Sequence, residues 1–332
     1  MLNRIEVFVI KYHEIKFSGD SSFRISKLVL GTDYFGTSVS RETSFALLDR
    51  FIEWGGNCID TARFYADWMP GGHGASETMI GQWLRASKAR SRVLLSTKGG
   101  HPPIENMQES RLYTRFIESD IDESLEALGT DYIDIYWLHR DSPDRTVEDI
   151  MGNLRPILKS GKVRAIGCSN WHTERIMEAN AYARARNMQP FCMSQIQWSL
   201  AASTPEAHGD LSKVIMNGED YNNYVSMQIP VMCYSSQAKG FFVRPLTGPN
   251  AINKKSYDWF CSPENLKRKE RVEEYARNTG LSPTAVTLGY VLCNRFPAMA
   301  LIGCRSIEQL DDSMAAAEVD IPLEDVDWLY NI

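Results

Sequence analysis

Three consecutive apolar runs read VLLSTK (residues 93–98), YIDIYWLH (132–139) and VRAIGCSN (163–170). Each run is short, rich in aliphatic and aromatic residues and ends in polar residues, which is typical of a buried strand in a parallel sheet. The chain contains five further runs of this kind: LVLG (28–31), NCID (57–60), FCMSQIQW (191–198), PVMCYS (230–235) and AMALIGC (298–304). We therefore expect eight strands.

Helical segments separate these runs. In RETSFALLDRFIEWGG (residues 41–56) apolar residues recur three and four positions apart, and a glycine pair ends the pattern. Parallel strands need such crossover helices, so eight strand–helix units predict an α/β protein with a closed (β/α)8 TIM barrel. The alternative is a doubly wound sheet, but no GxGxxG follows the first run, as its dinucleotide-binding form would require.

The chain is longer than a barrel needs. It has 332 residues, and a minimal barrel of about 250 leaves about 80 over. We assign the surplus to residues 1–27, an N-terminal extension with a β-hairpin on the barrel floor, and to two loops, 201–228 and 240–261. Long ordered loops are usually functional, so we expect a single domain over 1–332 whose extended C-terminal-face loops line the site.

The amino-acid composition limits the classes of binding partner and the cellular location that we expect. The 36 basic and 42 acidic residues give a net charge of −6, which argues against a nucleic-acid partner. No run of about 18 apolar residues is present, so we expect no membrane partner. The seven cysteines form no CxxC pair, which argues against a metal site and favours a reducing, cytoplasmic location.

Polar residues gather where the runs end. In a barrel, active sites lie at the carboxyl ends of the strands. The run ends carry Asp60, Lys98, His139, Ser169, Asn170, Gln195, Tyr234, Ser235, Arg305 and Ser306, and Tyr65 follows Asp60 in the next loop. We expect these residues to share one rim.

Four of them, Asp60, Tyr65, Lys98 and His139, suit proton transfer. A free phenol has a pKa of about 10, and a neighbouring ammonium would lower it. A carboxylate could hold that ammonium, and an imidazole could donate a hydrogen bond to a carbonyl oxygen. The set could therefore protonate an oxyanion while hydride reaches carbon, with the tyrosine as general acid.

Each of the four also has a purely structural interpretation. Asp60 could be a strand-end turn residue, and Lys98 could be solvated. His139 could make a structural hydrogen bond, and Tyr65 could be a rim aromatic. Spacing alone does not identify the reaction.

A resemblance to a known protein family does indicate a reaction. IDTARFY (59–65), TKGG (97–100), DIYWLHRD (134–141), IGCSNW (166–171), SQIQWSL (194–200), YSSQAKGFF (234–242) and IGCRSIEQLDDSMAA (302–316) occur in this order. Together they resemble the collinear motifs of the aldo-keto reductase family, in the branch of sugar and aryl-alcohol oxidoreductases. The resemblance runs from about Tyr12 to the C-terminus.

The resemblance implies a role for each residue. Tyr65 would be the general acid/base, tuned by Lys98 and Asp60, and His139 would orient the substrate carbonyl. The implied cofactor is NADPH, with NADH as the alternative, because a guanidinium such as Arg305 suits a 2′-phosphate. The implied cofactor contacts are Gly31, Thr32, Ser169, Asn170, Gln195, Tyr234 (stacked on nicotinamide), Ser235, Gln237, Gly240, Arg305, Ser306 and Gln309.

The sequence departs from the family pattern in two places. Ser313 stands where relatives commonly carry Asn, and it follows Asp311 and Asp312, whose charges would disfavour a phosphate. The loop after IDTA is longer than in many relatives and contains Trp68, which could line the pocket or pack within the loop.

The implied reaction is the reversible NADPH-dependent reduction of an aldehyde or ketone, such as a sugar or an aryl aldehyde. Tyr34, Trp68 and Trp171 are the expected substrate-pocket residues, with Phe35 and Trp198 as further candidates for an aromatic wall. The alternative function is a cofactor-binding regulatory or scaffolding homologue with little turnover. A metal-dependent or sugar-phosphate barrel enzyme would need a ligand cluster at the strand ends, and the run ends carry one histidine.

Overall fold

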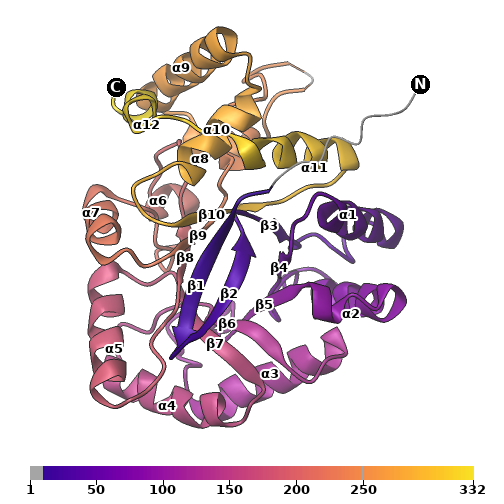
Figure 1. The fold of residues 1–332 in the computed structure, drawn as a ribbon, viewed down its shortest axis with the longest axis vertical. Coiled ribbons are helices and arrows are strands. Elements are labelled where there is room, and N and C mark those ends of the chain that lie inside the picture. Colours follow the sequence, from indigo (N-terminus) through magenta and orange to yellow (C-terminus); the bar gives the residue numbers. More distant parts are fainter. Residues whose placement is uncertain (1–9, 249) are drawn as a thin grey trace.

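Eight parallel strands form a closed barrel in the computed structural model, which describes residues 10–248 and 250–332 (Figure 1). The strands follow one another around the barrel in chain order, and the last pairs with the first. They are β3 (Leu28–Gly31), β4 (Cys58–Asp60), β5 (Leu94–Gly99), β6 (Ile133–Leu138), β7 (Val163–Ser169), β8 (Ser194–Gln197), β9 (Val231–Tyr234) and β10 (Ala298–Ile302). The predicted (β/α)8 barrel is confirmed.

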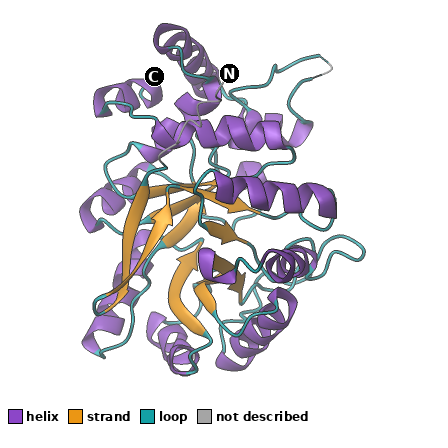
Figure 2. Ribbon diagram, turned by 45° about the vertical axis from the view of Figure 1, so that its right-hand side comes forward, coloured by secondary structure: helices purple, strands orange, loops and turns teal. Residues whose placement is uncertain are grey.

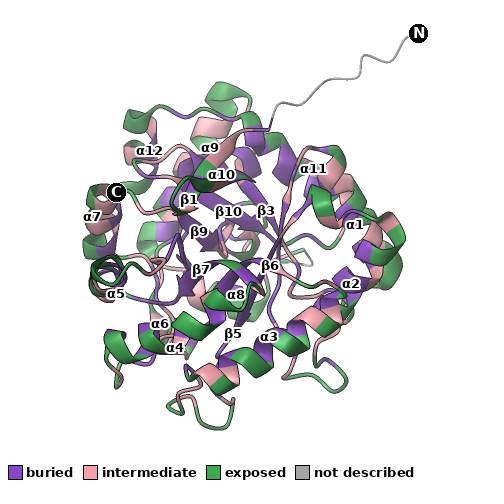
Figure 3. Cartoon of the chain, turned by 60° about the horizontal axis from the view of Figure 1, so that its bottom comes forward, coloured by how far each residue is buried: buried purple, intermediate pink, exposed green. Residues whose placement is uncertain are grey.

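Helices surround the barrel (Figure 2). Their outward faces are exposed, whereas the strands are buried (Figure 3). The helices are α1 (Arg41–Glu53), α2 (Ala75–Ser87), α3 (Thr114–Leu128), α4 (Val147–Lys159), α5 (Thr173–Ala185), α6 (Pro205–His208), α7 (Gly218–Met227), α8 (Lys254–Phe260), α9 (Pro263–Thr279), α10 (Pro283–Leu292), α11 (Ile307–Met314) and α12 (Leu323–Tyr330). Short 3-10 turns lie at Arg90–Arg92, Ala238–Gly240 and Ala315–Glu318. In the described part of the chain, no helix has both the length and the apolar character needed to cross a membrane.

The strand period of two decides which side chains point into the barrel. On β6, Ile135 and Trp137 belong to the interior cluster, while Tyr136 belongs to the cluster between barrel and helices. The Trp137 indole fills space beside Gly167, where a Cβ would lie 2.4 Å from its ring. His139 continues the inward series one step beyond the strand.

The N-terminal hairpin closes one end of the barrel. Strands β1 (Tyr12–Ser18) and β2 (Ser21–Ser26) pair antiparallel, as predicted. Ile15, Phe23 and Ile25 are buried in one cluster with the barrel-interior side chains Val29 and Met299. The hairpin is therefore the apolar floor of the barrel. The rest of the predicted extension, residues 1–9, lies outside the described residues.

Both predicted long loops lie at the opposite end. The first contains α6 and runs between β8 and α7, and the second contains α8 and follows β9. Residues 209–214 of the first loop and Arg244, Lys255 and Trp259 of the second line the cavity described below. The residues that these two loops add to a minimal barrel therefore form part of the cavity wall.

Candidate active site

A cavity of about 1320 Å³ lies at the carboxyl ends of the strands. Its wall contains nearly all of the residues predicted for the site: Gly31, Thr32, Tyr34, Asp60, Tyr65, Trp68, Lys98, His139, Ser169, Asn170, Gln195, Tyr234, Ser235, Gln237, Gly240, Arg305 and Gln309. Residues from the ends of all eight barrel strands, or from the loops after them, thus meet around one space.

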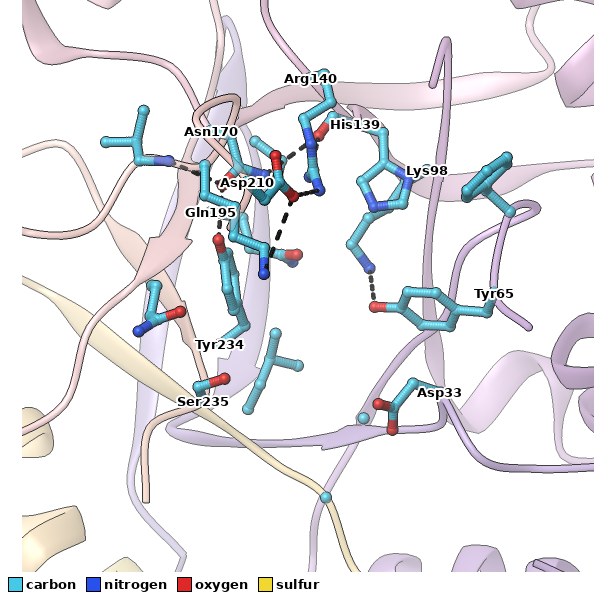
Figure 4. A pocket seen from close by; sticks show the side chains of 18 of the residues that line it. Asp33, Tyr65, Lys98, His139, Arg140, Asn170, Gln195, Asp210, Tyr234 and Ser235 are labelled. Atoms are coloured by element: carbon cyan, nitrogen blue, oxygen red, sulfur yellow. Dashed lines mark hydrogen bonds and ion pairs between the residues drawn. The ribbon is translucent and has the colours of Figure 1, made fainter. Parts of the chain in front are cut away.

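Lys98 is the centre of the expected tetrad. Its Nζ donates to Asp60 Oδ2 at 2.5 Å and to the Thr61 carbonyl oxygen at 2.7 Å. It also donates to Tyr65 Oη at 2.9 Å (Figure 4). Asp60 Oδ1 accepts further hydrogen bonds from Ser96 Oγ at 2.7 Å and Gln195 Nε2 at 3.1 Å. The Lys98 and Asp60 side chains are almost fully buried, so the ion pair is shielded from solvent and fixed by its partners.

The Tyr65 pKa moves in the direction opposite to our expectation. Burial raises it well above 10, and the negative charges of Asp60 and Asp33 add to the rise. Burial also lowers the pKa of Lys98, against the opposing effect of Asp60. Tyr65 is therefore a protonated phenol whose oxygen already accepts a hydrogen bond from Lys98.

His139 is a neutral imidazole beside Tyr65. The two ring centroids lie 6.2 Å apart, edge to face. Burial lowers the His139 pKa well below 6.5, and His101, Arg140 and Lys98 lower it further. Its backbone N–H donates to the Gly99 carbonyl oxygen at 2.9 Å, which ties the end of β6 to the end of β5.

A second polar group lies on the β7–β9 side of the cavity. Tyr234 Oη donates to Asn170 Oδ1 at 2.7 Å, and Asn170 Nδ2 donates to Ser169 Oγ at 3.0 Å (Figure 4). Asn170 has a positive φ of 59°, as Ser235 has at 53°. Such backbone geometry is uncommon outside glycine and often accompanies functional positions.

Arg305 lies at the start of α11. Its guanidinium carbon is 4.1 Å from the Tyr34 ring centroid, and its backbone N–H donates to Gln309 Oε1 at 2.9 Å. The Tyr34 ring therefore lies against the Arg305 guanidinium in the cavity wall. Ser306 departs from the prediction: its hydroxyl caps α11 by accepting from the Gln309 N–H, and it is not part of the cavity wall.

The two carboxylates that follow Gln309 separate in space. Asp311 Oδ1 accepts from Arg50 Nε at 2.8 Å and Trp54 Nε1 at 2.6 Å, outside the cavity. Asp312 is in the wall. Asp311, one of the two carboxylates expected near the phosphate of the cofactor, is therefore held outside the cavity.

The predicted aromatic wall is wrong for Trp171, Trp198 and Phe35, whereas Tyr34 and Trp68 do lie in the cavity wall. Trp171 is fully buried, meets Phe191 at 5.2 Å between ring centroids and is absent from the cavity wall. Trp198 points outward from β8, where it packs on Phe296, because the inward positions of that strand belong to glutamines. Phe35 is core as well. Trp68 is in the wall, with 57% of its surface exposed.

The wall residues that the sequence reasoning did not propose include four charged or titratable ones near the tetrad or the Asn170 group: Asp33, His101, Arg140 and Asp210. Asp33 faces Tyr65, and Arg140 Nη2 donates to Asp210 Oδ2 at 3.3 Å (Figure 4). A signal existed for the first three, since each directly follows a strand end or an adjacent turn. Asp210 lies in a loop, where the sequence gives no comparable indication.

Comparisons with known proteins identify the family of the chain. A norsolorinic acid reductase of Emericella nidulans is 29% identical over 96% of this chain and 80% of its own length. A putative aryl-alcohol dehydrogenase of Saccharomyces cerevisiae is 26% identical over 95% and 85%. An aldo-keto reductase of Schizosaccharomyces pombe named for NADP(+) is 26% identical over 85% and 80%. The model of the Aldo/keto reductase family matches residues 27–331. The chain therefore belongs to the aldo/keto reductase family and is an NAD(P)H-dependent oxidoreductase.

Proposed function

We propose that this chain uses NADPH to reduce an aldehyde or ketone to the alcohol, reversibly, with Tyr65 as general acid/base. One observation carries the proposal: the Lys98 ammonium lies between the Asp60 carboxylate and the Tyr65 phenol, in contact with both. A buried lysine in this position stabilises a phenolate, the form that Tyr65 takes when it gives up its proton.

The wall residues fit a nicotinamide dinucleotide. The Ser169, Asn170 and Gln195 side chains supply donors and acceptors for a carboxamide, and the Tyr234 ring supplies a stacking face. Gly31, Thr32, Ser235, Gln237 and Gly240 would lie along the sugar and pyrophosphate, with Gln309 toward the adenine. When bound, the cofactor supplies the hydride.

The chain's own residues would handle the proton. Neutral His139 can donate an N–H to the carbonyl oxygen and polarise it. Tyr65 then gives its proton to that oxygen as negative charge develops, and Lys98 stabilises the phenolate that remains. In the oxidative direction the same phenolate removes the proton from the alcohol.

Arg305 supports the preference for NADPH. Its guanidinium lies over Tyr34 and forms no ion pair within the described residues, so its charge is available to a 2′-phosphate. The name of the Schizosaccharomyces relative points the same way. The other relatives' names, a reductase and an aryl-alcohol dehydrogenase, support a small carbonyl or alcohol substrate.

Replacing Tyr65 by Phe tests the proposal. The variant lacks the proton donor, so we expect kcat to fall by about 10²–10⁴ while NADPH still binds. The measurements are NADPH consumption over a panel of sugar, aliphatic and aromatic carbonyls, and NADPH binding by fluorescence. Tyr182→Phe, on the outside of α5, is the matched control and should behave like the wild type.

Two outcomes would count against the proposal. Undiminished turnover by Tyr65→Phe would remove the role of Tyr65. Tight NADPH binding by the wild type, without consumption on any carbonyl, would favour the cofactor-binding regulatory alternative.

A further inference from the structure

The loop after β5 brings a second imidazole to the reaction centre. His101 is in the cavity wall, and its ring meets His139 edge-on at 4.8 Å between centroids. The His101 ring also stacks in parallel on Phe64, at 3.9 Å between centroids. His101 therefore lies beside His139, the residue that would orient the substrate carbonyl in the proposed reaction.

The fold fixes the loop that carries His101. A Cβ on Gly99 would lie 2.0 Å from the Tyr136 hydroxyl, and Gly100 has a φ of +68°. The Gly100 N–H donates to Asp120 Oδ2 at 2.7 Å, and the other carboxylate oxygen accepts from Arg111 Nη2 at 2.6 Å. His101 therefore owes its place to buried groups behind it and needs no ligand to hold it there.

The hydrogen bonding of the His101 ring determines which of its two nitrogens can accept a hydrogen bond from a ligand. Nδ1 lies 2.6 Å from the Pro102 carbonyl oxygen, which can only accept, so Nδ1 carries the hydrogen. Burial, together with the charge of Arg140, lowers the His101 pKa to about 4, so the ring is neutral. Nε2 then bears a lone pair, and within the described part of the chain no side chain or backbone group bonds to it.

The wall around His101 combines apolar side chains, such as Phe64 and Ile104, with charged ones. Arg140 donates to Asp210 and, through Nη1, to the His139 carbonyl oxygen at 3.1 Å. The tryptophans expected to form an aromatic face here, Trp171 and Trp198, are in the core. A substrate at this place therefore meets hydrogen-bonding groups as well as apolar surface.

We propose that the substrate carries a hydroxyl group on the carbon next to the carbonyl, and that His101 Nε2 accepts its hydrogen bond. This inference rests on the proposed carbonyl reduction and narrows its substrate to α-hydroxy aldehydes and ketones, the class that includes open-chain sugars. A substrate without the hydroxyl leaves the Nε2 lone pair unpaired when it fills the site, and a site built around such a bond discriminates against that analogue.

The test compares two aldehydes that differ by one hydroxyl, lactaldehyde and propanal. The readout is the ratio of their kcat/KM values with NADPH. We expect the wild type to favour lactaldehyde by about tenfold, the value of one hydrogen bond of ordinary strength. In His101→Phe, which keeps the ring but loses the acceptor, the ratio should fall to near one.

Two further variants complete the design. His101→Gln restores an acceptor oxygen and should recover part of the preference. His73→Phe replaces an exposed histidine outside the cavity wall and should keep the wild-type ratio. A wild-type ratio near one, or an unchanged ratio in folded His101→Phe, would overturn the inference. If the wild type consumed neither aldehyde nor any other carbonyl, the proposed function itself would fail.

Discussion

The two ends of the barrel bury side chains of opposite character. At the floor, Ile15, Phe23 and Ile25 of the hairpin pack against apolar barrel residues. At the rim, Asp60 and Lys98 are as deeply buried, yet they are ionic and held by hydrogen bonds. Burial at the floor stabilises the fold directly, whereas burial at the rim requires each polar group to have a partner.

The change from apolar to polar side chains is also seen within single strands. On β6 the inward positions pass from Ile135 to Trp137 and then to His139, from apolar floor to polar rim. On β5 they pass from Ser96 to Lys98. The same backbone thus serves stability at one end and chemistry at the other, and variants at the two ends should separate these properties.

Lys98→Met is the rim variant with the largest expected effect. It removes the cation beside Tyr65, so kcat should fall by about 10²–10⁴. It also leaves the buried Asp60 carboxylate without its ionic partner, which should cost about 3–5 kcal/mol of unfolding free energy. Steady-state kinetics and urea unfolding measure the two effects. The double variant Lys98→Met/Asp60→Asn should recover stability without recovering activity; a recovery of both would contradict the assigned geometry.

Phe23→Ala is the corresponding floor variant. Phe23 is 3% exposed in the interior cluster, so its truncation should cost about 3 kcal/mol. We expect kcat and KM of the folded enzyme to stay at the wild-type values. Phe17→Ala, at the half-buried ring that stacks on Phe23, should cost less. A fall in kcat under conditions where Phe23→Ala is folded would show that floor and rim are coupled.

Glu77→Gln probes a buried carboxyl group outside the tetrad. Glu77 Oε1 accepts from Thr97 Oγ1 at 2.6 Å, and burial raises the Glu77 pKa from 4.5 to about 7. The folded state therefore holds this proton more tightly than the unfolded state does. The stability this provides is fully present below pH 4.5 and is lost as pH rises through 7, by up to about 3 kcal/mol at 1.4 kcal/mol per pKa unit. Thermal unfolding of Glu77→Gln should lack that loss; parallel pH curves for the two proteins would refute it.

Arg305→Ala should have the smallest effect of these variants. We expect it to change the affinity for the cofactor and nothing else. Loss of a charge-assisted contact to the 2′-phosphate should weaken NADPH binding by about tenfold or more and leave NADH binding unchanged. Titration with both cofactors measures the difference. Equal weakening for both would mean that Arg305 does not distinguish them.

The sequence predicts the barrel and the inward placement of Asp60, Lys98 and His139 because these depend on strand positions, whereas Tyr65 lies in a loop and its role was implied by the family resemblance. Eight apolar runs at strand–helix spacing determine the architecture, and the period of two places Asp60 and Lys98 inward at strand ends. The N-terminal hairpin was predictable for the same reason. These features depend on local pattern and on the closure of one sheet.

The substrate wall was not predictable in this way. Trp171 follows Asn170, whose positive φ turns the chain, and this turn is accompanied by packing of the indole against Phe191. Asp311 turns away from the cavity because Arg50 and Trp54 of a distant segment hold it. Such contacts join residues far apart in the chain, and residue type alone does not reveal them.

Transfer of the hydride itself tests the central claim most directly. NADPH deuterated at the transferring C4 position is incubated with the enzyme and a carbonyl substrate, and the alcohol is analysed by mass spectrometry. We predict one deuterium at the former carbonyl carbon with the wild type and a labelled product formed at least about 100-fold more slowly with Tyr65→Phe. An alcohol without deuterium, or equal rates for the two proteins, would contradict the account.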